Sequence, residues 1–520
     1  MNALDLSRWQ FGITTVYHFV LVPLTIGLTP MVAIMQTIWY RTGNEQWLRA
    51  TKFFGKLFLI NFALGVATGI VQEFQFGMNW SEYSRFVADV FGAPLALEGL
   101  IAFFLESTFL GLWIFGWSRL PRRVHLATIW LASIGVTASA YFIVAANSFM
   151  QHPVGVVWDS VRDRPAMNDF WAVITNVTTL AAFPHVIAGA WLTAATFVGA
   201  IGIWWMSRNA WRAKKLRAAI DGDTTGMPRT TSPSQIDATP QDLERDAHQL
   251  WRPVTRFACC VAIVAGLVVA ISGDLQSQIM FKQQPMKMAA AESLCNTQDN
   301  AGFSVLSIGR QNNCDNIEHV IEIPGMLSFL ATHRFNQTLQ GVNQLQEHYQ
   351  QVLNMPGHNF APNLFVTYWG FRAMITWALG SVVVALGGLW LTRKKSIVAS
   401  RRFGLFALWL IPTPFLANAS GWIFTEMGRQ PWVVAPNWEN NLDPLRIHML
   451  VEDGVSNHTP PVLWVTLIGF TLLYGGLGVV WFLLQRRYAI EGPSAYDHIA
   501  PEVESGDSDA DEPKQLSFAY

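Results

Sequence analysis

Residues 12–38 read GITTVYHFVLVPLTIGLTPMVAIMQTI, a run that contains no Asp, Glu, Lys or Arg. An α-helix needs about 20 apolar residues to cross the hydrocarbon core of a bilayer, so this stretch predicts a transmembrane helix. Eight further apolar runs of similar length follow. The nine predicted spans are 12–38, 53–77, 92–117, 123–149, 180–206, 254–274, 363–392, 404–426 and 460–485. The expected fold is therefore all-α, a polytopic helix bundle in a membrane.

The composition supports a membrane protein. Of the 520 residues, 51% are hydrophobic and only 14% are charged, whereas about a quarter of residues are charged in ordinary soluble domains. The net charge of -1 and the lack of a basic stripe argue against nucleic-acid binding. The first apolar run is not preceded by a basic segment or followed by a small-residue cleavage site. We therefore expect no removable signal peptide, and insertion through the first helix.

Positive charge alternates between the loops. Basic residues cluster after the odd-numbered spans: Arg41, Arg49, Lys52 and Lys56; Arg119, Arg122 and Arg123; Lys214, Lys215 and Arg217; Arg393, Lys394, Lys395, Arg401 and Arg402; Arg486 and Arg487. Because cytoplasmic loops carry an excess of Lys and Arg, these loops are expected in the cytoplasm. The prediction places the N-terminus outside and the C-terminus in the cytoplasm.

Two long segments separate the membrane helices. Residues 218–253 are polar and turn-rich, which is typical of a flexible connector, here cytoplasmic. Residues 275–362 lie on the outer side and are too long for a simple connection, which favours a functional loop. The predicted membrane parts are 1–217 with helices one to five, 254–274 with helix six, and 363–490 with helices seven to nine. The acidic tail, 491–520, has few apolar residues and is expected to be disordered.

Ionisable and soft side chains inside the spans are few, and such residues often mark functional sites. They are His18, Glu98, Glu106, His185, Met374 and Glu426. A structural role is also open, since a membrane His can form an interhelical hydrogen bond and a Met can simply pack. Counted at about 1.5 Å per residue, the two histidines, the Met and Glu426 all fall in the outer half of the membrane. Imidazole and thioether form the axial pair of electron-transferring haems, so the pattern suggests a redox chain.

Copper chemistry is disfavoured by the number of histidines. A copper-containing oxygen reductase needs several intramembrane imidazoles, because imidazole is a preferred copper ligand. Of the 12 His in the chain, only His18, His185 and, at a margin, His125 lie in predicted spans.

The run GWIFTEMGRQPW, residues 421–432, closely resembles a motif of subunit I of cytochrome bd quinol oxidases. The same family pattern is matched by the first-span His, LEG…E in span three, ANSFMQHPVG (146–155), FRAM (371–374) and KMAAAE (287–292). The resemblance extends over all nine spans. It implies the haem-bearing subunit of a terminal oxidase that oxidises membrane quinol at the outer face and reduces O2 to water.

The resemblance implies two haems b and one haem d. His185 and Met374 would be the axial ligands of the low-spin haem b. His18 and Glu426 would each ligate one of two high-spin haems, with His18 on haem d in the better-known members. The sequence leaves open which high-spin haem His18 takes.

Three further residues are expected beside the cofactors by the same resemblance. Arg372 would lie close to the low-spin haem, and Arg429 of the GRQPW motif would lie at a haem site. Trp422 would lie between haems, although packing or anchoring at the membrane interface is an equally open role for a membrane Trp.

The outer loop corresponds to the quinol-binding loop of the family. Lys287 and Glu292 match the Lys and Glu of its motif, while Met288 and Ala291 depart from the enteric pattern. An ammonium group can hydrogen-bond a quinol oxygen, and a carboxylate can accept its proton. The implied partners are subunit II, small accessory subunits, membrane quinol and O2. The implied location is the inner (plasma) membrane of a prokaryote, and no nucleic-acid partner is expected.

A proton path is predicted from the carboxylates of span three. Haems near the outer face would draw protons for water from the cytoplasm, which separates charge without a pump. Glu98 and Glu106 are eight residues apart, or about 12 Å and 80° on a regular helix, with Glu106 nearer the cytoplasm. Ser139 of span four could add a hydroxyl at similar depth. Glu98 could instead serve a haem site, and both carboxylates could be structural.

Two other functions remain open from the residues alone. A proton-coupled transporter would use Glu98 and Glu106 as its relay, and a haem b membrane anchor of a dehydrogenase would lack the oxygen-binding haem. Neither accounts for FRAM and GRQPW together.

The four cysteines divide between the membrane and the outer loop. Cys259 and Cys260 lie in span six and are expected to stay reduced. Cys295 and Cys314 lie in the outer loop, where an oxidising compartment permits a disulfide. The sequence predicts that this bridge orders the C-terminal half of the loop.

Overall fold

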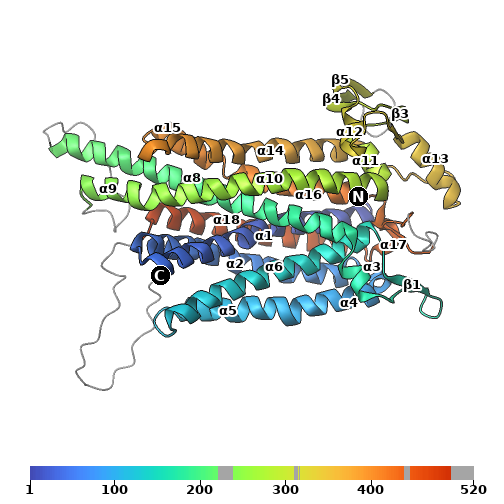
Figure 1. Ribbon diagram of the computed structural model, residues 1–520. Coiled ribbons are helices and arrows are strands. Elements are labelled where there is room, and N and C mark those ends of the chain that lie inside the picture. The colour runs from blue at the N-terminus through green and yellow to red at the C-terminus, as the bar shows by residue number, and fades with distance from the viewer. Residues whose placement is uncertain (221–237, 310–313, 315–316, 439–445, 494–520) are drawn as a thin grey trace, which may run out of the picture.

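The computed structural model describes residues 1–220, 238–309, 314, 317–438 and 446–493. Within them, nine helical segments are long and apolar enough to cross a membrane, as predicted. They are α1 (Ala3–Thr42); α2 (Glu45–Met78); α4, η1 and α5 (Ala88–Leu97, Glu98–Phe103, Phe104–Phe115); α6 (Arg122–Gln151); α7 and α8 (Phe170–Ile174, Val177–Ile220); α9, η3 and α10 (Pro240–Asp246, Ala247–Trp251, Arg252–Gln283); α14 (Leu364–Leu391); α15 and α16 (Arg401–Trp409, Pro412–Gly428); and α18 (Pro460–Glu491). Their long axes run side by side in one bundle (Figure 1).

Short elements gather at the end of the bundle where the chain begins (Figure 1). They form four two-stranded antiparallel sheets and several short helices. These are α3 (Ser81–Phe86), β1 (Val156–Asp159), β2 (Arg164–Met167), α11 (Pro285–Ala291), β3 (Gln298–Asp299), β4 (Phe303–Gly309), β5 (Ile317–Ile323), α12 (Met326–Thr332), β6 (Thr338–Leu339), α13 (Val342–Val352), β7 (Trp432–Val434), β8 (Met449–Leu450) and α17 (Val451–Gly454). The short 3-10 turn η4 (Arg393–Lys395) follows α14. We call the end with the sheets the loop end and the other the far end.

Small residues let the central helices approach closely. A Cβ atom on Gly27 of α1 would lie 2.2 Å from the Ala190 carbonyl oxygen of α8, and one on Gly202 of α8 would lie 2.2 Å from Thr255 Oγ1 of α10. In a bilayer the hydrophobic effect does not drive helices together, so membrane helices associate through van der Waals and polar contacts. Small residues at the interface allow the backbones to approach closely enough for these contacts. These contacts make α8 the central helix of the bundle.

Packing differs between the two halves of the bundle. In α1 every residue from 23 to 33 is buried, whereas among residues 11–20 only Thr14 is buried. In α8 every residue from 192 to 203 is buried, while residues 184–187 are not. The main apolar core therefore fills the far half. Side chains in the half near the loop end keep accessible surface although their helices are flanked by other spans.

The described part of the predicted connector is helical. The sequence pattern indicated a flexible segment over 218–253, yet α8 continues to Ile220 and α9 begins at Pro240, so the flexible assignment is wrong for these parts. Thr239 caps α9 through a reciprocal pair of hydrogen bonds with Asp242, a capping box that outweighs the polar composition. Residues 221–237 of the connector and 494–520 of the predicted disordered tail lie outside the described residues.

Two predicted spans are less regular than expected. Residues Glu98–Phe103 form a π-helical segment within span three, and span eight breaks between Trp409 and Pro412. Proline cannot donate a backbone hydrogen bond, so it starts a new helix. The estimated 80° rotation between Glu98 and Glu106 assumed a regular α-helix and is wrong, because a π segment follows a wider i→i+5 bonding pattern.

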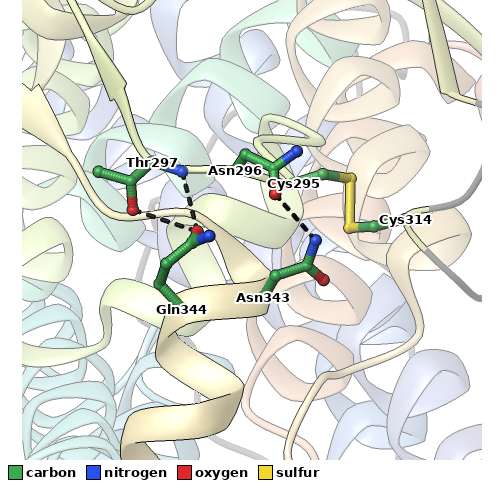
Figure 2. The surroundings of a disulfide bond; sticks show 6 residues. All are labelled: Cys295, Asn296, Thr297, Cys314, Asn343 and Gln344. Atoms are coloured by element: carbon green, nitrogen blue, oxygen red, sulfur yellow. Dashed lines mark hydrogen bonds between the residues drawn. A yellow bond between two sulfur atoms is a disulfide. The ribbon is translucent and has the colours of Figure 1, made fainter.

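The predicted disulfide between Cys295 and Cys314 is present, with Cα atoms 5.4 Å apart. Figure 2 shows its surroundings: Asn343 Nδ2 donates to Asn296 Oδ1 (3.0 Å), and Thr297 donates through its backbone nitrogen to Gln344 Oε1 (2.9 Å). The bridge joins the segment after α11 to the turn between β4 and β5. Cys259 and Cys260 are free thiols, as predicted.

Loss of this disulfide should destabilise the loop end. The bridged cysteines are 19 residues apart, and the loop-entropy relation gives about 3 kcal/mol for a loop of that size. We expect a Cys314→Ser variant to unfold at the loop end at lower denaturant concentration, with Cys260→Ser as the matched control. Mass spectrometry of non-reduced peptides should find the bridge. Two alkylatable thiols at Cys295 and Cys314 in the native protein would contradict it.

Candidate functional site

His18 lies on α1 and is oriented by α2. Its Nδ1 atom is 2.9 Å from Thr68 Oγ1. The Thr68 hydroxyl already directs its hydrogen to the carbonyls of Leu64 and Gly65, so it accepts from His18. The proton therefore sits on Nδ1, and Nε2 keeps its lone pair. This is the tautomer that binds a metal, with the second nitrogen held by an outer partner.

His185 on α8 repeats this arrangement. Its Nδ1 atom lies 3.2 Å from the Val269 carbonyl oxygen and 3.2 Å from Ser272 Oγ, both on α10. A carbonyl can only accept, so Nδ1 carries the proton and Nε2 is again free to act as a ligand. Two helices far apart in sequence thus fix this imidazole for coordination.

His125 provides the contrast. Gln36 Nε2 lies 2.8 Å from its Nδ1, and the Trp113 carbonyl oxygen lies 2.8 Å from its Nε2. Both ring nitrogens are occupied by protein partners. His125 is therefore a structural residue, and the intramembrane histidines with a free nitrogen are the two that the sequence proposed as haem ligands.

Glycines border three of the four predicted ligands. A Cβ on Gly69 would lie 3.2 Å from His18 Cε1, one on Gly273 would lie 3.1 Å from His185 Cε1, and one on Gly421 would lie 2.8 Å from Met374 Sδ. A side chain at any of these positions would crowd the ligand. The glycines, the free Nε2 atoms and the accessible surface in this half of the bundle all fit the requirements of haem groups.

Glu426, the fourth predicted ligand, ends α16 with both oxygens supported. Asn147 Nδ2 of α6 donates to Oε1 at 2.9 Å, and Arg429 donates to Oε2. Arg429 is buried and also donates to the Val433 carbonyl. Charge-assisted bonds of this kind are short and directional, so they hold the carboxylate in one orientation. Trp422, one turn earlier, lies 6.4 Å from the Phe11 ring of α1, between the helices of Glu426 and His18.

Arg372 and Glu292 form a buried ion pair in the half of α14 that is nearer the loop end. Arg372 Nη2 donates to Glu292 Oε2 at 2.7 Å and to the Ser304 carbonyl at 2.5 Å, and Nη1 donates to the Ala291 carbonyl. Glu292 is 4% exposed. Burial raises the pKa of Glu292 to about 7, against the opposing pull of Arg372. The carboxyl can therefore gain and lose a proton near neutral pH. Its ion-pair partner, Arg372, precedes Met374 by two residues on α14.

Lys287 is also buried, at 3% exposure. Its Nζ donates to Gln151 Oε1 at 2.5 Å, and its stem crosses the end of α16, where a Cβ on Gly428 would lie 2.8 Å from Lys287 Cγ. Burial lowers the pKa of Lys287 to about 7, with the nearby Arg429 adding to the effect and Glu426 opposing it. The structure thus places Lys287 beside the Glu426 site and Glu292 beside Arg372, rather than together on one open surface.

The carboxylates of span three meet α6. Ser139 Oγ donates to Glu98 Oε1 at 2.6 Å. One turn earlier on α6, a Cβ on Gly135 would lie 2.8 Å from the Glu106 backbone nitrogen, so the two helices touch at Glu106. Glu98 begins the π-helical segment, and Glu106 is 9% exposed. Among the described residues neither carboxylate has an ion-pair partner, which leaves both available to carry protons.

Comparison with known proteins decides the family. A family model described as cytochrome bd terminal oxidase subunit I matches residues 6–493. The chain belongs to this family. It is therefore a subunit of a terminal quinol oxidase, an oxidoreductase, and a cytochrome family implies haem cofactors. Membership decides against the transporter and dehydrogenase-anchor alternatives.

Individual relatives cover nearly the whole bd oxidase chain. Cytochrome bd ubiquinol oxidase subunit 1 of Bacillus subtilis is 39% identical over 499 residues, 96% of this chain and 96% of that protein. Cytochrome bd-II ubiquinol oxidase subunit 1 of Escherichia coli is 33% identical, covering 97% of this chain and all of its own length, 100%. A chain of the bd oxidase from Geobacillus thermodenitrificans shares the fold, with a TM-score of 0.73, 24% identity and coverage of 94% of this chain and 98% of that chain.

Several residues of the bd oxidase site were missed by sequence reasoning. Thr68, Ser272 and Asn147 support predicted ligands from other helices, and only the motif around Asn147 gave any signal. Glu73 of α2 was also missed, although it interrupts an apolar span and lies close enough to Glu98 for like-charge repulsion. Gln151 belongs to the motif ANSFMQHPVG, but its contact with Lys287 depends on the tertiary fold.

Proposed function

We propose that this subunit oxidises membrane quinol at the loop end, passes electrons through a low-spin haem b to two high-spin haems, and there reduces O2 to water. The observation that carries the proposal is the pair of intramembrane histidines with Nδ1 engaged as a donor and Nε2 left available. A histidine that ligates a metal through one ring nitrogen typically donates a hydrogen bond from the other. His125 differs, because both of its ring nitrogens have protein partners.

The ligands divide between the haems as follows. His185 and Met374 would hold the low-spin haem b, because imidazole and thioether give a six-coordinate iron with a raised potential. His18 and Glu426 would each hold one high-spin haem, one of type b and one of type d, with haem d proposed for His18. When bound, the haems supply electron transfer and oxygen reduction. Arg372, Arg429 and Trp422 would line these sites.

Glu292 is the proposed acceptor of the quinol proton. Its pKa of about 7 allows it to take a proton from the quinol hydroxyl and then release it. Arg372 holds the carboxylate in place through a 2.7 Å contact. Lys287 would orient the quinol loop against the end of α16, and its ammonium would stabilise negative charge there.

Protons for water would come from the opposite side. Glu106 and Glu98 would carry them toward the haems, with Ser139 holding Glu98. The alternating basic loops support an orientation with the far end in the cytoplasm and the loop end outside. Quinol protons then leave outside while consumed protons enter from the cytoplasm, so the reaction separates charge without pumping. The relatives named subunit 1 support assembly with a subunit II, and a prokaryotic plasma membrane is the proposed location, with small accessory subunits as further partners.

Reduced-minus-oxidised spectra of membranes that overexpress the complex test this function. We expect b-type bands and a chlorin band. His185→Ala should remove the low-spin b band, and His18→Ala should remove a high-spin band. His333→Ala, an exposed His on the loop side, is the control and should leave all bands unchanged. A b-type spectrum without chlorin would contradict the proposed haem d, and the absence of any haem would contradict the proposed reaction.

A further inference from the structure

Glu292 is enclosed by protein, so any proton that it accepts needs a route to the outer solvent. Its side chain is 4% exposed, and the neighbouring Ser293 is 5% exposed. Its ion-pair partner Arg372 offers only hydrogen-bond donors and no acceptor site, so it cannot relay a proton. The route must therefore use other groups near the carboxyl. This question rests on the proposed function, which makes Glu292 the quinol base.

The β4–β5 hairpin lies over this region and carries two buried serines. Ser304 is 1% exposed and Ser307 is 4% exposed. Residues three apart in a regular strand point to opposite faces. Here the pairing register shifts between Ser304 and Leu306 and again between Leu306 and Ser307. A bulge of this kind re-aims a side chain, and it brings both hydroxyls to the same face, toward Tyr368 of α14.

A continuous chain of hydroxyl groups results. Tyr368 OH is 3.2 Å from Ser304 Oγ, and Ser304 Oγ is hydrogen-bonded to Ser307 Oγ. Ser307 Oγ is 2.7 Å from Nδ1 of His319, its cross-strand partner on β5. Tyr368 is buried and His319 is exposed. Each hydroxyl can accept one proton and donate another, so the chain connects the interior with the solvent.

The inner end of the chain lies next to Glu292. Arg372 donates both to Glu292 Oε2 (2.7 Å) and to the Ser304 carbonyl (2.5 Å), and its guanidinium carbon lies 3.7 Å from the centre of the Tyr368 ring. A cavity of about 10 Å³ lies beside the hydroxyl chain, lined by Ser293, which follows Glu292 in the chain, by Ser307 and Tyr368, and by five apolar side chains. That volume is about what one water molecule needs, and the three hydroxyl groups are the polar partners that the water would have.

The disulfide fixes the hairpin over the carboxyl. Cys295 follows Glu292 by three residues, and Cys314 lies in the turn between β4 and β5. The covalent tie therefore joins the segment of the base to the hairpin of the serines. Among the described residues, this disulfide is the one covalent cross-link between the segment of Glu292 and the β4–β5 hairpin.

We propose that Tyr368, Ser304, Ser307 and His319 form the exit path for the proton that Glu292 takes from quinol. Glu292 releases its proton to the water in the cavity, which passes one to the hydroxyl chain. Ser307 delivers a proton to His319 Nδ1, and the imidazole loses a proton from Nε2 to the outer solvent. The hydroxyls then reorient, and no group is oxidised or reduced in the transfer. Among the residues that the structure describes, charged groups near the path include Glu318 and Glu322 on the same strand and Arg372 at its inner end.

The test uses the assembled oxidase in membranes, with two electron donors. A short-chain quinol analogue must lose protons at Glu292, whereas tetramethylphenylenediamine delivers electrons without quinol. We expect His319→Ala to lower kcat with quinol about tenfold, less than the 10²–10⁴-fold of a complete general base, with KM little changed. Imidazole added outside should restore most of the rate. Oxidation of the diamine should be unchanged.

Three further variants make the test independent of folding and of the proposed function. Ser307→Ala should slow quinol oxidation similarly without rescue by imidazole, and His333→Ala, an exposed His off the path, should have no effect. Unchanged quinol oxidation in both His319→Ala and Ser307→Ala overturns the exit path. Glu292→Gln should abolish quinol oxidation but spare the diamine; if it keeps quinol oxidation, the assignment of Glu292 as base fails instead.

Discussion

Replacing Glu106 with Gln should nearly abolish quinol-driven oxygen consumption while leaving the haem content intact. Gln keeps the shape of the side chain but cannot carry a proton. Glu106 is 9% exposed, and α6 contacts its backbone through Gly135, so no neighbouring water-filled surface can replace it. Loss of a positioned proton-transfer group costs about 10²–10⁴-fold in rate, and we expect a decrease of at least about 100-fold.

The measurements are oxygen uptake and membrane charging in proteoliposomes, with haem content as a check on assembly. Glu106→Asp keeps a titratable proton and should retain part of the activity. Glu45→Gln, at the exposed start of α2, is the control for loss of a carboxylate and should behave like the wild type. Normal turnover with normal charging in Glu106→Gln would sink the proposed path.

Met374→Leu should remove the low-spin haem signature and block electron entry from quinol. Leu has nearly the volume of Met but no sulfur, so packing is preserved while the ligand is lost. Met is also the ligand that raises the potential of a His/Met haem. A Cβ on Gly421 would lie 2.8 Å from Met374 Sδ, so the glycine leaves space at the sulfur on that side.

Low-temperature spectra and redox titration report this change. Met206→Leu is the matched control, because Met206 is fully buried in the far half of α8 and touches no proposed ligand. We expect its spectrum and potential to equal those of the wild type. An unchanged low-spin band and potential in Met374→Leu would show that another residue ligates the iron.

The sequence predicted the helix bundle, which the structure confirms, and it proposed the ligand residues, because both stand out from their local surroundings in the chain. An apolar run signals a span, and His18, His185 or Glu106 is conspicuous within one. What supports these residues comes from other helices: Thr68 on α2 and Val269 on α10 fix the imidazoles. No local pattern announces such partners, since they depend on how the helices are packed.

Lys287 and Glu292 illustrate a second limit. Their motif indicated a quinol-binding loop, but it did not indicate that both side chains are buried. Lys287 lies against Gln151 and Glu292 against Arg372. Burial of two charges needs compensating partners. These partners lie 136 residues from Lys287 and 80 residues from Glu292 along the chain, out of reach of motif reading.

The uneven packing of the bundle also has an electrical consequence. A densely packed apolar half holds little water and polarises weakly, so it behaves as an insulator. In the proposed orientation this insulator lies between the cytoplasm and the haem ligands. Most of the membrane potential then falls across it, at about 2.3 kcal/mol per charge for each 100 mV. A proton carried from the cytoplasm through Glu106 toward the haem ligands therefore moves against nearly the full voltage, and each one consumed stores that work.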